Sequence, residues 1–283
     1  MLINISLLYK FKRDYMFRVI KLCLLLILIL FCAKSTTFGQ SVYNWDNKKD
    51  GRVLAASAVF WGGSRYLVAV ANDVSVEQIN ALDKNNIWSF DRSAVDNLSP
   101  STRGISDIFL YSSVSLPFLH YLNPTCRKEG FAITGMTLQA FFITDGITNF
   151  FKVSTRRLRP YTYNPNVSID EKLKTEAKFS FISGHTSNTA LFSVMSAKIY
   201  ADIFPNSKLK PYIWTAALLI PSATGYFRYR SGRHFPTDVM GGFIVGASIG
   251  YLIPHLHKIS TEELSFELLP VPNGMLLACH KMF

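Results

Sequence analysis

The chain has 283 residues, of which 49% are hydrophobic, and its mean hydropathy is +0.18. This length fits one domain with a substantial core, and the hydropathy lies between that of soluble enzymes and that of proteins with many membrane spans. The formal net charge is +11, but no recognised nucleic-acid-binding motif accompanies it, so the charge favours an anionic lipid surface or a phosphorylated substrate over nucleic acid.

Residues 1–40 have the pattern of a secretory signal. Basic side chains precede a purely apolar run at residues 22–31, and a more polar segment follows up to Gln40. The pattern predicts cleavage near Gly39 and Gln40, with an uncleaved signal anchor as the alternative. A start at Met16 would give a signal peptide of ordinary length.

The rest of the chain alternates polar stretches with apolar segments of helical length. An apolar stretch at 53–71 is interrupted by Gly62, Gly63 and Arg65, and a polar, turn-rich stretch reaches residue 104. Five apolar segments then follow, at 105–122, 130–151, 184–204, 212–228 and 238–257. Each is close to the length that crosses a bilayer as a helix.

The C-terminal tail differs from these segments. Two short strand-like runs flank Asn273 and Gly274, a dipeptide typical of a tight hairpin turn. The sequence therefore predicts an all-α fold, a transmembrane bundle of about five to six helices, with a small C-terminal hairpin. The expected divisions are a signal peptide or anchor at 1–40, an extracytoplasmic segment with a packing helix at 41–104, a catalytic bundle at 105–257 and a tail at 258–283.

Three motifs carry the chemistry. They are Lys152-x6-Arg159-Pro160, then Ser183-Gly184-His185, then Arg228-x5-His234-x3-Asp238. The cations can neutralise the oxygens of a phosphoryl group, while one imidazole attacks phosphorus and the other handles the proton of the leaving group.

These motifs resemble the signature of the type 2 phosphatidic acid phosphatase (PAP2) superfamily, which also contains bacterial class A acid phosphatases and vanadium haloperoxidases. The resemblance covers residues 105–257. Ile182 stands where the pattern K-x6-R-P, P-S-G-H, S-R-x5-H-x3-D has a proline, and Phe227 stands where it has a serine. Neither difference removes a charge or a histidine.

The resemblance implies a role for each residue on a motif position. His234 is the expected nucleophile, Asp238 its orienting carboxylate and His185 the general acid. The expected phosphate-binding residues are Lys152, Arg159, Ser183, Gly184 and Arg228. Because cations occupy the place of a metal, the expected reaction needs no metal and no cofactor.

The leading prediction is a metal-independent phosphatase that acts on phosphate monoesters or diphosphates of lipid-like substrates through a phosphohistidine. One alternative is a vanadium-dependent haloperoxidase, in which His234 would ligate vanadate. Another is a non-catalytic lipid-binding membrane protein. The expected partners are a phosphorylated lipid or small phosphate ester and the membrane, with no nucleic acid; the sequence leaves the oligomeric state open.

The sidedness prediction depends on how many segments cross the membrane. If the signal delivers residue 41 outside and 53–71 does not cross, the Lys152–Ile182 loop lies outside, in the periplasm. Arg127 and Lys208 then lie inside, as the positive-inside tendency favours. A soluble periplasmic enzyme is the alternative.

Overall fold

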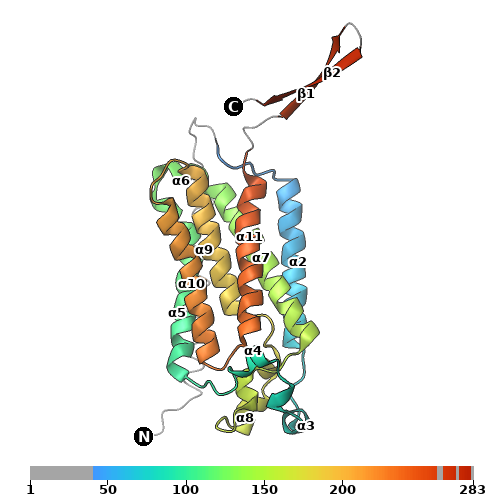
Figure 1. Ribbon diagram of the computed structural model, residues 1–283, viewed down its shortest axis with the longest axis vertical. Helices are drawn as coiled ribbons and strands as arrows, with labels where there is room; N and C mark the ends of the chain where they lie inside the picture. The colour runs from blue at the N-terminus through green and yellow to red at the C-terminus, as the bar shows by residue number, and fades with distance from the viewer. Residues whose placement is uncertain (1–40, 260–263, 272–273, 282–283) are drawn as a thin grey trace.

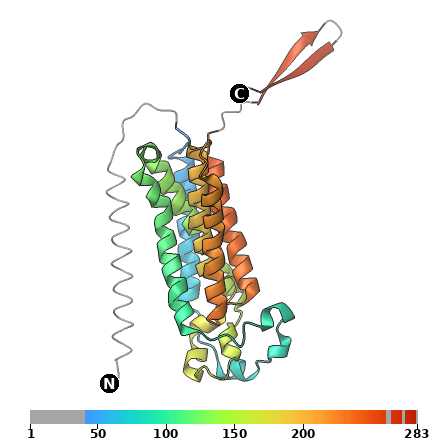
Figure 2. The ribbon, with the colours of Figure 1, turned by 60° about the vertical axis from the view of Figure 1, so that its left-hand side comes forward.

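The computed structural model describes residues 41–259, 264–271 and 274–281, so the predicted signal segment lies outside the described residues. In this part of the chain, six long helices run along one axis (Figures 1 and 2). They are α2 (Lys49–Ala69), α5 (Pro100–Leu119), α7 (Gly130–Thr155), α9 (Gly184–Ile203), α10 (Lys210–Arg230) and α11 (Pro236–His257).

Shorter elements lie in the connections. The short α-helices are α3 (Val76–Asn80), α4 (Ser89–Arg92), α6 (Pro124–Lys128) and α8 (Ile169–Leu173). Single 3-10 turns occupy Lys84–Asn86, His120–Leu122, Pro160–Tyr163 and Thr175–Lys178. Strands β1 (Leu264–Val271) and β2 (Gly274–Lys281) pair antiparallel. The all-α bundle, its five predicted long helices and the hairpin strands are therefore confirmed.

Helix α9 is the centre of the bundle. It packs against α5, α7, α10 and α11, and most of its residues are buried. Ser183 caps its first turn by accepting a hydrogen bond from the backbone N–H of Thr186. The main core combines apolar residues of α7 and α9, including Ile133, Met136, Leu191, Met195 and Ile199.

Helix α11 approaches α9 closely because glycines line the contact. A Cβ built on Gly242 would lie 2.5 Å from the carbonyl oxygen of Ser183, and one built on Gly250 would lie 2.6 Å from that of Leu191. At Gly246, the added carbon would collide with the carbonyl oxygen of Ser187. The glycines that recur every four residues in this helix therefore serve packing.

Several polar side chains inside the bundle bond to their own helix. Thr137 donates to the carbonyl of Ile133, and Thr189 donates to that of His185. One pair links two helices, since the hydroxyls of Thr148 on α7 and Ser187 on α9 lie 3.0 Å apart. The hydroxyls of Thr137 and Thr189 thus satisfy their bonding within their own helices.

Helix α2 packs along the bundle. It runs beside α7 along the bundle axis (Figure 1), and its Trp61 donates to the Asp145 carboxylate of α7. The bundle therefore begins well before residue 105. If the bundle crosses a bilayer, α2 crosses with it, so Ser41 and the Lys152–Ile182 loop lie on opposite sides.

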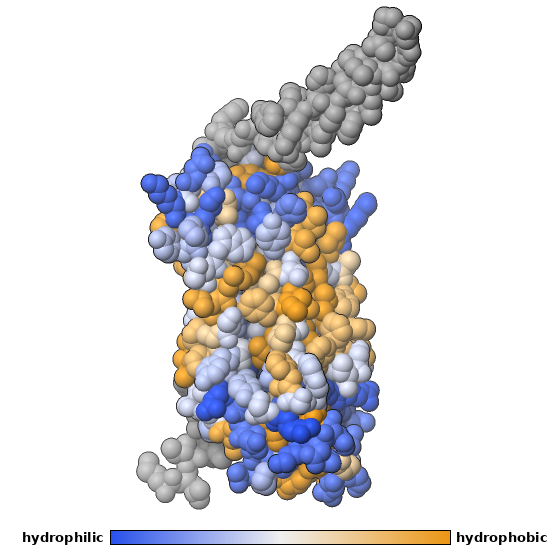
Figure 3. Space-filling view, in the orientation of Figure 1, coloured by the Kyte–Doolittle hydropathy of each residue, from blue (hydrophilic) through white to orange (hydrophobic). Residues whose placement is uncertain are grey.

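Apolar side chains gather around the middle of the bundle. Figure 3 shows them between two hydrophilic ends, and several of the exposed ones belong to different helices. Examples are Val59 on α2, Ile108 on α5, Leu219 on α10 and Ile244 on α11. Among the described helices, α11 is the one that is both long and apolar enough to cross a membrane by length and composition.

The close α9–α11 contact predicts the effect of a small substitution. Gly246→Ala should lower the free energy of unfolding by about 1–3 kcal/mol, because the added methyl group overpacks the helix contact. Thermal unfolding of the purified protein in detergent measures the change. Gly63→Ala on α2 is the matched control, since nothing lies within 4 Å of its added carbon. An unchanged midpoint for Gly246→Ala would contradict the packing described here.

Candidate active site

The predicted site residues come together at one end of the bundle, where α7 and α10 end and α9 and α11 begin. The loop between α10 and α11 holds His234, whose side chain is 2% exposed. Its Nδ1 lies 2.8 Å from the carbonyl oxygen of Ser180. Because a carbonyl can only accept, Nδ1 carries the proton and Nε2 keeps the lone pair that a nucleophile needs.

Asp238 has a different local role from the one expected. Its Oδ2 lies 3.5 Å from Nδ1 of His234, farther than the Ser180 carbonyl, so the carboxylate does not make the main bond to the ring. It accepts hydrogen bonds from the hydroxyl of Ser180 (2.5 Å), from the backbone N–H of Phe235 (2.9 Å) and from Arg157 (2.6 Å). Asp238 therefore orients His234 indirectly, by fixing the two segments around it.

His234 is neutral in this setting. Burial lowers the pKa of His234 well below its usual range, and the positive charges of Arg159, Arg228 and Lys152 lower it further. These three cations come from the first and the third motif. A neutral histidine ringed by cations can attack an anionic phosphoryl group without being protonated first.

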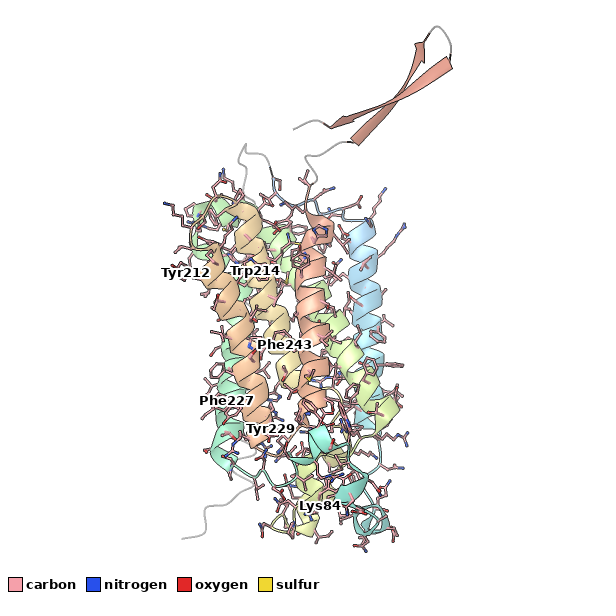
Figure 4. All side chains as sticks on the ribbon, viewed as in Figure 1. Lys84, Tyr212, Trp214, Phe227, Tyr229 and Phe243 are labelled. Atoms are coloured by element: carbon pink, nitrogen blue, oxygen red, sulfur yellow. The ribbon has the colours of Figure 1, made fainter. Side chains whose placement is uncertain are left out.

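Arg228 is buried with incomplete hydrogen bonding. Its Nη1 lies 3.4 Å from the hydroxyl of Ser106, but its Nε has no hydrogen-bond partner within the described ranges. Phe227, at the position of the pattern's serine, packs its ring on Phe109 of α5 near the site end of α10 (Figure 4). A buried guanidinium with an unpaired N–H is suited to an anionic ligand.

Two other cations complete the set. Arg159 is buried and donates from Nε to the carbonyl of Glu176 at 2.9 Å. The ammonium of Lys152 lies 3.1 Å from where a Cβ on Gly184 would stand. A side chain at that position would press on the ammonium, which explains the glycine of the Ser-Gly-His motif.

The start of α9 supplies the last two predicted groups. Ser183 is fully buried, and its hydroxyl lies 3.0 Å from that of Thr186. Its backbone N–H donates to the carbonyl of Asp238 at 2.9 Å, which joins the second motif to the third. Gly184 and His185 follow as the first residues of the helix, where backbone N–H groups favour an anion.

His185 is the more accessible of the two histidines. Its side chain is 26% exposed, and its Nε2 lies 2.8 Å from Oδ1 of Asp107 on α5. Sequence patterns did not single out Asp107, because it lies 78 positions before His185 in the chain.

Sequence analysis also missed an ion-pair network behind the site. Arg157 bridges two buried carboxylates, with 2.7 Å from Nη2 to Asp91 and 2.6 Å from Nη1 to Asp238. Asp91 in turn accepts from the backbone N–H and hydroxyl of Thr237. Arg157 also lies 4.1 Å over the ring of Phe235. These contacts brace the first turn of α11, which follows His234 directly.

The remaining basic residues near the motifs do not converge on His234. Arg233 pairs with Glu171 at 2.9 Å and with Glu176 at 3.2 Å. Arg156 is exposed, and Arg230 donates to Asn97 at the surface.

One family model matches a segment of this chain. A family model described as the PAP2 superfamily matches residues 131–262, which include every predicted site residue. The match spans just under half of the chain, which is similar to the PAP2 superfamily over this segment. This PAP2 segment holds α9, α10, α11 and nearly all of α7, whereas α2 and α5 precede it.

Two curated relatives match part of the chain. A lipid A 4'-phosphatase of Porphyromonas gingivalis is 31% identical over 150 residues, which are 51% of this chain and 58% of the relative. A phosphatidylglycerophosphatase B of Bacillus subtilis is 33% identical over 121 residues, which are 42% of this chain and 56% of the relative. The chain thus spans less than two thirds of the length of these curated relatives.

One solved structure is also similar. It is the crystal structure of the first transmembrane PAP2 type phosphatidylglycerolphosphate phosphatase from Bacillus subtilis. The two chains are 22% identical, with a TM-score of 0.45, and the match covers 72% of this chain and 94% of that one.

The ion pairs of Arg157 predict that its substitution lowers stability, whereas substitution of the neighbouring Arg156 does not. Arg157→Gln should lower the free energy of unfolding by about 1–3 kcal/mol, because it leaves the buried carboxylates of Asp91 and Asp238 without their shared donor. Denaturant unfolding measures this change. Arg156→Gln removes the same charge from an exposed position and should have little effect. Equal losses in the two variants would contradict the bridging role of Arg157.

Proposed function

We propose that this protein is a PAP2-type lipid phosphatase that uses His234 as a nucleophile and needs no metal. The observation that carries the proposal is the state of His234. Its Nδ1 is hydrogen-bonded to the Ser180 carbonyl, its imidazole is buried, and its Nε2 keeps a lone pair near the cations of the first and third motifs.

The first chemical step forms a phosphoenzyme. Nε2 of His234 attacks phosphorus, the bond from phosphorus to the ester oxygen breaks, and His185 gives its proton to the departing oxygen. Lys152, Arg159 and Arg228 neutralise the phosphoryl oxygens, with the Nε of Arg228 as one donor. These side chains supply the charge that a metal ion supplies in other phosphatases.

The second step regenerates the enzyme. His185 takes a proton from a water molecule, the water oxygen bonds to phosphorus, and the bond from phosphorus to His234 breaks. Inorganic phosphate leaves, and both histidines return to their starting protonation states.

The substrate class follows from the surface around the site. The apolar belt of the bundle would place the site at the edge of a bilayer, within reach of a lipid headgroup. The names of both curated relatives specify lipid phosphates as substrates. We therefore assign phosphate esters of amphiphilic lipids as the substrate class, with the bundle embedded in the membrane.

The nucleophile can be tested by substitution. His234→Ala should reduce phosphate release by about 1,000-fold or more, because the covalent route is lost. The wild-type protein should form a labelled phosphoenzyme that survives alkaline denaturation, as a phosphoramidate does, and the variant should not. Wild-type activity should persist in EDTA and fall with vanadate, which mimics the phosphoryl group.

His255→Ala is the matched control, since this histidine is exposed at the opposite end of α11. It should keep wild-type activity. Phosphate release by His234→Ala at the wild-type rate would remove the nucleophile assignment. Loss of wild-type activity in EDTA, restored by a divalent metal, would remove the metal-independent mechanism.

The charges of the loops indicate on which side of the membrane the site lies. The short connections at the end opposite the site carry basic residues, namely Arg127, Lys128, Lys208 and Lys210. The positive-inside tendency therefore favours that end in the cytoplasm. The N-terminal signal pattern favours the reverse once α2 is counted as a crossing. We propose that the loop charges, which flank four of the long helices, decide the orientation over the N-terminal signal pattern. The site then faces the periplasm.

Cysteine labelling distinguishes these orientations. In a background without the four native cysteines, Ser168→Cys at the site end should react with an impermeant thiol reagent in whole cells whose outer membrane has been permeabilised. Lys208→Cys at the opposite end should react only after lysis. Both positions are exposed, so they form a matched pair. The reverse pattern would place the site in the cytoplasm.

A further inference from the structure

The contact between His185 and Asp107 poses an electrostatic question. A general acid must hold a proton before the substrate arrives, yet burial and the nearby cations Arg228 and Lys152 disfavour the protonated form of His185. Asp107 is the carboxylate in direct contact, 2.8 Å from Nε2. It is about 4.0 Å from Nη1 of Arg228, so its closer partner is the imidazole.

The position of Asp107 in the fold suits a carboxylate that serves as the partner of His185. It comes from α5, which packs against α9 and α10, and its side chain is only 19% exposed. The preceding Ser106 contacts Arg228, so the same turn of α5 touches two residues of the site. This turn lies outside residues 131–262, and none of the three motifs includes it.

We propose that Asp107 is the positioning residue of His185, which holds the ring in place and keeps it protonated for donation to the leaving oxygen. This inference rests on the proposed function. Asp107 acts through His185 and does not bond to phosphorus. The proton passes from His185 to the ester oxygen as that oxygen leaves phosphorus, and the ring regains a proton from the water that attacks the phosphoenzyme.

The loss of activity in a variant without the Asp107 charge should depend on the leaving group of the substrate. Asp107→Asn keeps the size of the side chain but removes the charge that stabilises the imidazolium. Alkyl phosphates depend on a general acid because an alkoxide leaves poorly, whereas p-nitrophenolate leaves with little protonation. The variant should therefore lose activity selectively on alkyl substrates.

The experiment compares kcat/KM on a long-chain alkyl phosphate and on p-nitrophenyl phosphate. Asp107→Asn should lower the first value by about 10- to 100-fold and change the second by less than about 3-fold. The alkaline limb of its pH profile on the alkyl substrate should move about one unit lower, because an imidazole without its carboxylate releases its proton at lower pH. Asp96→Asn, which removes one exposed charge at the same end of the bundle, should leave both substrates unchanged.

A second variant covers the case in which Asp107→Asn does not fold. Asp107→Ala leaves space for a small carboxylate, and added formate should restore its activity on the alkyl phosphate. Equal losses of Asp107→Asn on both substrates, an unmoved alkaline limb or no rescue by formate would each overturn the role of Asp107. A wild-type protein inactive on both substrates would instead overturn the proposed function itself, and the inference with it.

Discussion

The buried carboxylate of Asp238 holds the candidate site together. It accepts a hydrogen bond from Ser180, another from the backbone of Phe235 and an ion-paired bond from Arg157. These donors lie before α9, between α10 and α11 and after α7, so one side chain joins the segments that carry all three motifs. Ser180 then presents its carbonyl to His234. The tautomer of His234 depends on this arrangement, because the carbonyl that fixes it comes from a loop that Asp238 anchors.

The distribution of charge makes the site ready for an anion. Cations surround His234, while carboxylates act one layer away, where Asp91 and Asp238 share Arg157 and Asp107 contacts His185. The unpaired Nε of Arg228 shows that the donors around the nucleophile are not all satisfied within the described protein. The two histidines therefore have opposite electrostatic needs. In the proposed mechanism, His234 must be neutral as the nucleophile, and His185 must hold a proton as the general acid in spite of the same cations.

Helix α2 affects the number of bilayer crossings that would separate residue 41 from the site. Its interruption by Gly62, Gly63 and Arg65 suggested a segment outside the catalytic bundle, but it packs on α7, and Trp61 and Arg65 both approach the Asp145 carboxylate. The Asp145 carboxylate thus gives the polar atoms of Trp61 and Arg65 a partner within the bundle. If α2 crosses a bilayer with the rest of the bundle, residue 41 and the site lie on opposite sides, and the orientation that the loop charges favour opposes the one that the predicted N-terminal signal favours.

The sequence by itself determined the long helices after residue 100, the hairpin strands and the candidate site residues, because apolar length and motif spacing are local properties. The sequence grouped His185, His234 and the three cations into one candidate site. It misjudged the main partner of His234 and missed Asp91 and Asp107 as contributors to the site. Those contacts join residues dozens of positions apart in the chain, and an isolated aspartate in a polar loop or helix has no local signature. Only the packing of α4 and α5 against the site decided which carboxylates reach it.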